Sequence, residues 1–188
     1  AAVPHPLTIF PRLTTLLPAL FVSAVMVLAI AGPRLSAQAA DALERGESGL
    51  PLPRFVSLSA SEVNVRMGPS RNHKIKWTYR KRGLPVEIVR EFDNWRRVRD
   101  ADGEEGWVHH SLLSGRRTAL VTPWSTGETV PLRASASQRA RTKALLEPLV
   151  LAAVEECDGS WCAISGAGWR GHVPQRALWG VYPQEEVD

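Results

Sequence analysis

Beyond residue 40, short apolar runs alternate with turn residues at intervals of about eight to twelve positions, which is typical of a small all-β barrel or sandwich. The clearest run is Val63-Asn64-Val65-Arg66, where the valines share one strand face and the polar side chains face outward. The pattern predicts strands over residues 63–66, 76–80, 85–92, 95–100 and 106–109. The best helical candidate after residue 40 is short and leads into Pro148, so no long helix is expected there.

Gly68 and Pro69 interrupt the first of these strands. Glycine tolerates a positive φ, and proline has no amide hydrogen with which to continue a ladder. We expect the two residues to end the strand and to start a loop over residues 70–75. Arg66 is expected to hold this loop by donating to its carbonyl groups, and ligand binding is its alternative role.

The motifs of the first strands recur later in the chain. EFDNWR at residues 91–96 lies 66 positions before CDGSWC at residues 157–162, and Gly106-Trp107-Val108 matches Gly171-His172-Val173. The repeat predicts two copies of one barrel of about sixty residues. We place the copies at residues 55–115 and 116–181, with a tail over residues 182–188.

The N-terminal segment indicates the compartment. Residues 13–31 read LTTLLPALFVSAVMVLAIA, nineteen residues without a charge, and Ala37-Gln38-Ala39 supplies the small residues of a cleavage site. Residues 1–39 are therefore expected to form a hydrophobic helix, either a cleaved signal peptide or a membrane anchor. Residues 40–54 are interpreted as a linker. Both alternatives place the two copies outside the cytoplasm: periplasmic or secreted, or anchored in the inner membrane.

Positive charge is concentrated in the first copy. Residues 54–117 hold fourteen Lys and Arg and eight Asp and Glu, a net charge of +6, whereas residues 118–188 hold six and eight, a net charge of −2. Basic side chains around an aromatic platform suit an anionic ligand, and the alternative is a basic loop with aromatics that cover the core. The candidate ligand-binding residues are Arg71, Lys74, Lys76, Trp77, Tyr79, Arg80, Lys81, Arg82 and Trp95.

The repeat also predicts a disulfide. Asp93-Asn94 and Gly159-Ser160 favour two-residue hairpin turns. Such turns place Glu91 opposite Arg96 in the first copy and Cys157 opposite Cys162 in the second. Cysteines paired in this way are close enough to be joined in an oxidising compartment.

The sequence favours a protein without catalytic chemistry. Two cysteines joined to each other leave no thiol nucleophile and too few ligands for structural zinc. The adjacent His109 and His110 point to opposite faces of a strand, so they do not share a metal ion. We expect no catalytic residue, no metal site and no cofactor.

Several motifs of the first copy together resemble the bacterial SH3-like (SH3b) family. They are Asn64-Val65-Arg66-Met67-Gly68-Pro69-Ser70, Gly83-Leu84-Pro85-Val86, Asn94-Trp95, Gly106-Trp107-Val108 and Leu112. The second copy departs, with Ala134-Ser135-Ala136 in place of Gly-Pro-Ser and His172 in place of Trp107. The resemblance implies an SH3-like barrel for each copy and attachment to cell-wall or peptide ligands.

The leading hypothesis is an exported, non-catalytic binding module of the cell envelope with a cell-wall peptide, glycan or protein ligand. An anionic ligand fits the charge, whereas nucleic acid is disfavoured because an exported protein seldom meets it. Membrane contact is expected only through residues 13–31, if they are not cleaved. The alternatives are a membrane-tethered interaction or sensor module and a cell-wall hydrolase, which is disfavoured because two barrels leave no room for a catalytic fold.

Overall fold

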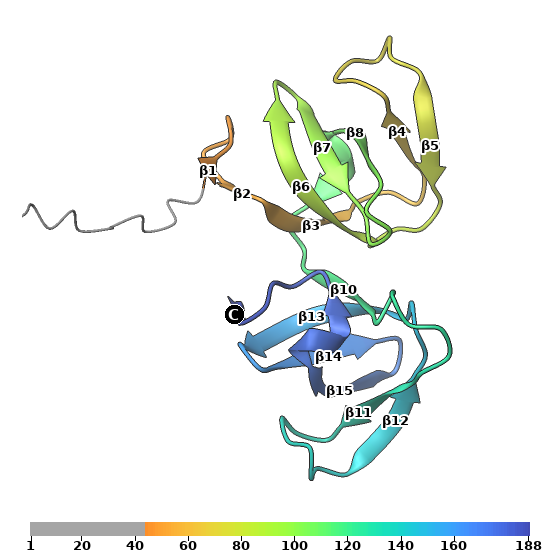
Figure 1. Cartoon of the computed structure of the whole chain (residues 1–188), viewed down its shortest axis with the longest axis vertical. Coiled ribbons are helices and arrows are strands. Elements are labelled where there is room, and N and C mark those ends of the chain that lie inside the picture. The colour runs from red at the N-terminus through yellow and green to blue at the C-terminus, as the bar shows by residue number, and fades with distance from the viewer. Residues whose placement is uncertain (1–43) are drawn as a thin grey trace, which may run out of the picture. The chain divides into compact units, whose positions relative to one another are not determined.

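The computed structural model describes residues 44–188 of the 188-residue chain. The hydrophobic helix predicted for residues 1–39 lies outside the described residues. Within residues 44–188, no helix is long and apolar enough to cross a membrane. This part of the chain is mostly β-strand and belongs to one compact unit (Figure 1).

The first copy is a seven-stranded antiparallel sheet in the order β5-β4-β8-β7-β6-β3-β9. Its strands are β3 (Arg54–Leu58), β4 (Val63–Arg66), β5 (Ile75–Tyr79), β6 (Pro85–Phe92), β7 (Trp95–Arg99), β8 (Glu105–His109) and β9 (Leu113–Ser114). The short 3-10 helix η1 (His110–Leu112) joins β8 to β9. All five predicted strands are present, each within one residue of its predicted bounds.

The second copy repeats this topology strand for strand, in the order β12-β11-β15-β14-β13-β10-β16. Its strands are β10 (Thr118–Val121), β11 (Val130–Arg133), β12 (Thr142–Leu146), β13 (Leu151–Asp158), β14 (Trp161–Gly166), β15 (Trp169–Pro174) and β16 (Leu178–Trp179), with η2 (Gln175–Ala177) before β16. The best helical candidate of the sequence, residues 138–146, is not a helix: it lies in β12 and the loop before it. Each sheet curls into a half-barrel (Figure 1).

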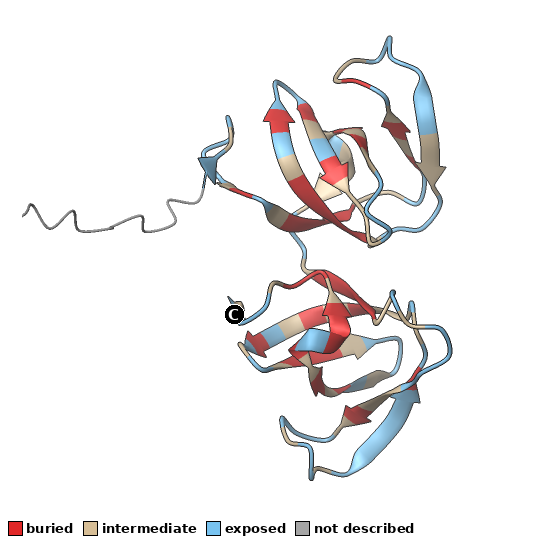
Figure 2. Cartoon of the chain, in the orientation of Figure 1, coloured by how far each residue is buried: buried red, intermediate tan, exposed pale blue. Residues whose placement is uncertain are grey.

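Each copy encloses its own hydrophobic core, as the alternating pattern predicts (Figure 2). Val63 and Val65 of β4 are completely buried, whereas Asn64 and Arg66 remain partly exposed. Leu132 of β11 holds the position of Val65 in the second core and is also completely buried. Removing these side chains from water supplies the main driving force for folding.

The loop after β4 is held as predicted, but for a partly different reason. Arg66 donates from Nη1 to the His73 carbonyl at 2.7 Å, and Arg133 donates likewise to the Ala140 carbonyl at 3.0 Å in the second copy. Gly68 does not use the positive φ that glycine tolerates. The exposed ring of His73 lies over this position, and a Cβ there would be 2.5 Å from its Nε2 atom, so a larger residue would displace the ring.

The hairpin tips of the two copies carry the predicted cross-strand pairs. Glu91 lies opposite Arg96, and the Arg96 Nε atom is 3.1 Å from the carboxylate. Cys157 lies opposite Cys162, with the Cα atoms 4.1 Å apart, and the two residues form a disulfide. An ion pair in one copy is therefore replaced by a covalent bond in the other.

Part of the segment interpreted as a linker folds against the first copy. Strands β1 (Glu44–Arg45) and β2 (Pro51–Leu52) form a small hairpin, and Leu52 enters the first core. The backbone amide and the hydroxyl of Ser48, in the turn of this hairpin, donate to the Glu91 carboxylate at 2.7 and 2.8 Å. Arg54 donates to the same carboxylate at 2.5 Å.

The predicted tail is also folded in part. Strand β17 (Glu186–Val187) pairs with the end of β13 at Cys157 and Asp158. Within this segment, the Glu185 carboxylate accepts two hydrogen bonds from Arg117, at 2.7 and 2.9 Å.

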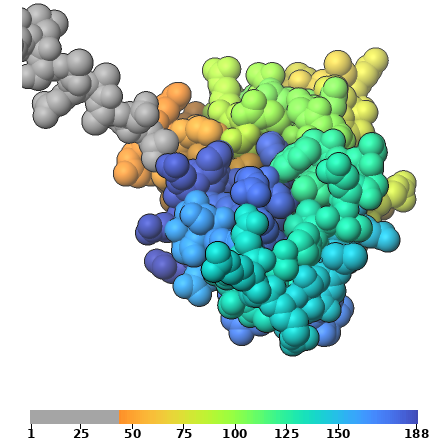
Figure 3. Space-filling model, turned by 60° about the horizontal axis from the view of Figure 1, so that its bottom comes forward, coloured from red at the N-terminus to blue at the C-terminus, as the bar shows by residue number. Residues whose placement is uncertain are grey.

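Contacts between the copies involve both backbone and side chains. The Thr118 hydroxyl donates to the Gly83 carbonyl at 2.7 Å, and the Tyr182 hydroxyl donates to Glu87 at 2.9 Å. Phe55 packs against the ring of Tyr182, with ring centroids 4.7 Å apart. In Figure 3 the dark blue C-terminal residues accordingly adjoin the orange residues near position 50.

Glu91 is a buried carboxylate whose charge is compensated by the groups around it. Its side chain is 1% exposed. Burial alone would raise its pKa, but the hydrogen bonds from Ser48 and Arg54 outweigh burial and lower the pKa from its ordinary value of 4.5 to about 2. The charged form is therefore favoured in the folded protein.

Because the folded-state pKa lies below the unfolded one, Glu91 contributes stability above pH 4.5 that is lost as the pH falls toward 2. The pKa difference corresponds to about 3 kcal/mol. We expect Glu91→Gln to lower the free energy of unfolding at pH 7 and to flatten its decline below pH 4.5, measured by urea denaturation. The exposed Glu128→Gln is the control. Parallel pH profiles for wild type and Glu91→Gln would contradict the assignment.

Candidate functional site

A groove of about 410 Å³ opens on the outer face of the first copy. Its lining comes from the start and outer face of β4, the following loop, the start of β7, the end of β8 and η1. The residues are Glu62, Asn64, Arg66, Arg71, Trp95, His109, Ser111 and Leu112. This volume is within the range of small-molecule sites, roughly 300–1,000 Å³.

The two arginines of the groove have different surroundings. Arg66 is committed to the loop through its hydrogen bond to the His73 carbonyl. Arg71, on that same loop, is exposed and forms no ion pair within residues 44–188. Arg66 therefore holds the backbone that carries Arg71, and the guanidinium of Arg71 keeps its donors for a ligand.

The remaining polar groups of the groove are oriented by local hydrogen bonds. The Asn64 side-chain carbonyl accepts from the Thr78 hydroxyl at 2.7 Å, so its amide nitrogen retains two donors. The Nδ1 atom of His109 lies 2.8 Å from the Ser111 hydroxyl and accepts from the Ser111 backbone amide at 3.4 Å. With Nδ1 as the acceptor, Nε2 of neutral His109 carries the hydrogen.

The surroundings of His109 favour its neutral form. Burial lowers the pKa of His109, and His110, Arg71 and Arg96 lower it further, while Asp93 acts in the opposite direction. The His109 ring stands perpendicular to Trp95, with centroids 5.4 Å apart. Trp95 and Leu112 supply the apolar part of the groove.

The groove combines several donors with an apolar surface. Guanidinium, amide and imidazole N–H groups can all donate to an acceptor-rich group, and a carboxylate offers two strong acceptor oxygens. Glu62 is the only acidic residue in the lining. The arrangement suits a ligand with a carboxylate on an apolar or peptide stem.

Of the predicted ligand-binding residues, the structure brings Arg71 and Trp95 together in the groove. Arg82 lines a different cavity. The others lie outside the groove lining: Lys74, Lys76, Trp77, Tyr79, Arg80 and Lys81. The basic segment is thus divided between different surfaces.

Trp77 and Tyr79 lie on one face of β5, and both rings pack against the first core. The Tyr79 hydroxyl donates to Asp100 at 2.9 Å. Lys76 is paired with Glu104 at 2.9 Å. These contacts support the alternative interpretation, in which the aromatics cover the core.

The sequence reasoning assigned Asn64, His109 and Ser111 no role in binding. Asn64 could have been identified from the alternation of β4, because its neighbours Val63 and Val65 point inward and Asn64 therefore points outward. His109 could have been found from the hairpin register, since it lies opposite Trp95.

The second copy lacks the same groove. Pro174 lies opposite Trp161, where His109 lies opposite Trp95, and Pro131 follows Val130 where Asn64 follows Val63. A smaller cavity of about 130 Å³ near Trp161 includes the carboxylates of Glu156 and Asp158. Any ligand of the second copy therefore meets a surface of different charge.

The contacts of the histidine, serine and cysteine side chains bear on the candidate chemistry. Within residues 44–188 no group of three or more His, Cys, Asp or Glu side chains is placed to hold a metal ion. Both cysteines of the chain are in the disulfide. His109 and Ser111 form a contact at the start of η1, and no carboxylate within residues 44–188 hydrogen-bonds to the ring.

The paired half-barrels and the surface groove define a protein built of tandem SH3-like modules. A family model described as the bacterial SH3 domain matches residues 59–115 and again residues 126–180. The chain belongs to the bacterial SH3 domain family, with two copies, as the resemblance indicated.

Comparison with solved structures gave distant matches. NlpC2 from Trichomonas vaginalis shares 13% identity at a TM-score of 0.31, over 68% of this chain and 48% of that one. NlpC1 from Trichomonas vaginalis shares 13% at 0.30, over 71% and 48%. An NlpC/P60 family protein from Bacillus cereus shares 9% at 0.31, over 66% and 55%. The chain spans about half the length of these structures. Comparison with curated proteins gave no match.

The electrostatics of the groove can be tested by titrating His109. We expect its ring resonances, followed by NMR, to titrate with a midpoint below the ordinary 6.5. Arg71→Gln should raise this midpoint because it removes a nearby positive charge. The exposed Arg139→Gln, in the second copy, should leave it unchanged. A midpoint at or above 6.5, or no response to Arg71→Gln, would show that Arg71 does not act on the groove.

Proposed function

We propose that this protein is an exported, non-catalytic binding module of the cell envelope, and that the groove of its first copy takes a carboxylate-bearing peptide of the cell wall. The supporting observation is the position of the Arg71 guanidinium beside Trp95 in one groove. Membership in the bacterial SH3 domain family agrees with cell-wall attachment.

A carboxylate ligand follows from the chemistry of the lining. Arg71 can form a bidentate pair with it, and the Asn64 amide can donate a further hydrogen bond. The stem of the ligand would lie against the Trp95 ring, which is itself 8% exposed. Peptides of the cell wall combine free carboxylates with short side chains, which matches these requirements.

A non-catalytic role is proposed because of the contacts of the candidate nucleophiles. Cys157 and Cys162 are bonded to each other. A serine nucleophile needs a base that is itself oriented by a third group. The His109–Ser111 contact instead closes the turn into η1 through the Ser111 backbone.

The groove can be tested by co-sedimentation of the purified protein with insoluble peptidoglycan. We expect the wild type to pellet and Arg71→Glu to bind about tenfold more weakly, because one charge-assisted hydrogen-bonded pair is lost. Arg139→Glu changes the charge equally in the loop at the corresponding place of the second copy and should bind like the wild type. A wild type that stays in the supernatant, or an equal loss in both variants, would overturn the proposal.

A second candidate function is that of a membrane-tethered interaction or sensor module. It rests on residues 13–31, which contain no charged side chain. N-terminal sequencing of the native protein separates the two. We expect a start at Ala40, which means release by cleavage after Ala39. A native protein that retains residues 13–31 would indicate tethering.

A further inference from the structure

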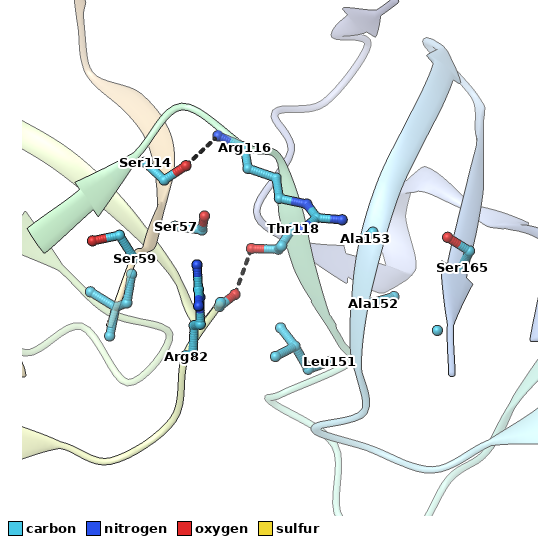
Figure 4. A pocket seen from close by; sticks show the side chains of 13 residues that line it. Ser57, Ser59, Arg82, Ser114, Arg116, Thr118, Leu151, Ala152, Ala153 and Ser165 are labelled. Atoms are coloured by element: carbon cyan, nitrogen blue, oxygen red, sulfur yellow. Dashed lines mark hydrogen bonds between the residues drawn. The ribbon is translucent and has the colours of Figure 1, made fainter. Parts of the chain in front are cut away.

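A second cavity, of about 380 Å³, lies between the two copies. It is separate from the groove, with which it shares no lining residue. The first copy contributes β3, the loop before β6 and β9, and the second copy contributes Arg116 and the start of β10. The second copy contributes the facing parts of β13 and β14. Figure 4 shows this cavity and the side chains that line it.

The charge of the cavity lining is entirely positive. Arg82 and Arg116 are its two charged residues, and no Asp or Glu lines it. Both arginines are exposed, and neither forms an ion pair within residues 44–188. Two uncompensated guanidinium groups at one cavity attract an anion.

Hydroxyl groups accompany the two arginines in the lining. Ser57 is 2% exposed and is one of the lining residues. The Ser114 hydroxyl accepts from the Arg116 amide at 3.2 Å, which leaves its own hydrogen free to donate. The two hydroxyls add neutral donors to the guanidinium groups of the lining.

The number and charge of the donors favour a phosphoryl group over a carboxylate. A carboxylate has two oxygens, which one guanidinium already occupies when the pair is bidentate. A phosphate monoester carries more negative charge and offers three terminal oxygens, so it can accept from a second guanidinium and from a serine hydroxyl as well. The opposite wall is formed by Leu151, Ala152 and Ala153, so it suits the organic part of an ester.

We infer that the cavity between the copies binds the phosphoryl group of a phosphate monoester through Arg82 and Arg116. The site needs both copies, since Arg82 precedes β6 and the apolar wall belongs to β13. The hydrogen bond from Thr118 to the Gly83 carbonyl holds the residue next to Arg82 against the start of the second copy. This inference does not depend on the groove or on its cell-wall ligand.

The site can be tested on the full chain by NMR titration with inorganic phosphate and with glycerol 3-phosphate. We expect saturable shifts of the backbone amides of Gly83, Ser114, Ala152 and Gly166. The double variant Arg82→Gln/Arg116→Gln should weaken binding about a hundredfold, roughly tenfold for each charge-assisted interaction lost. The matched control is Arg90→Gln/Arg139→Gln, which removes two exposed charges outside the cavity and should bind like the wild type.

Co-sedimentation with vesicles distinguishes the sources of the phosphoryl group. Pelleting with phosphatidic acid vesicles but not with phosphatidylcholine vesicles, lost in the double variant, would assign a lipid headgroup. Binding of glycerol 3-phosphate without pelleting would assign a soluble ester. Three results would overturn the inference: shifts that do not saturate, shifts that chloride reproduces at equal ionic strength, and shifts that persist in the double variant. Peptidoglycan binding by the double variant is expected to be unchanged, so the two proposals fail separately.

Discussion

Each half-barrel is closed across one residue pair, and the rest of the structure depends on this closure. β4 meets β8 only where Arg66 lies opposite Trp107, and β11 meets β15 only where Arg133 lies opposite His172. A glycine precedes the second member of each pair. A Cβ on Gly106 would lie 2.3 Å from a methyl group of Val65, so the two strands approach more closely than any side chain allows.

The closure brings the parts of the groove together. It places the outer face of β4 beside the start of β7 and the end of β8, and the guanidinium of Arg66 fixes the loop that carries Arg71. The same scaffold exists in the second copy, where Arg133 holds the corresponding loop. Pro131 and Pro174 stand where the first copy has Asn64 and His109. The difference between the copies therefore lies in side chains and not in topology.

The period of two along the strands allowed their positions to be predicted, and turn chemistry allowed the pairs at the hairpin tips to be predicted. The folding of the β1–β2 hairpin could not be predicted, because its contacts are with Glu91, far along the chain. Glu185 was missed for the same reason, since its partner is Arg117. In the site, Arg71 and Trp95 were predicted from composition. The packing of Trp77 against the core stood only as one of two alternatives, because alternation shows that two residues share a face but not which face meets the core.

The two hairpin tips show how one position can be stabilised by different chemistry. A buried carboxylate in the first copy requires donors on every side, and the turn of the β1–β2 hairpin supplies them through Ser48. The disulfide of the second copy needs no polar partner, and β17 covers that tip by backbone pairing and by packing Val187 against the core. The same C-terminal segment also carries Tyr182, whose hydroxyl donates to Glu87 of the first copy. The segments that flank the copies therefore complete both cores and hold the junction from which the cavity is built.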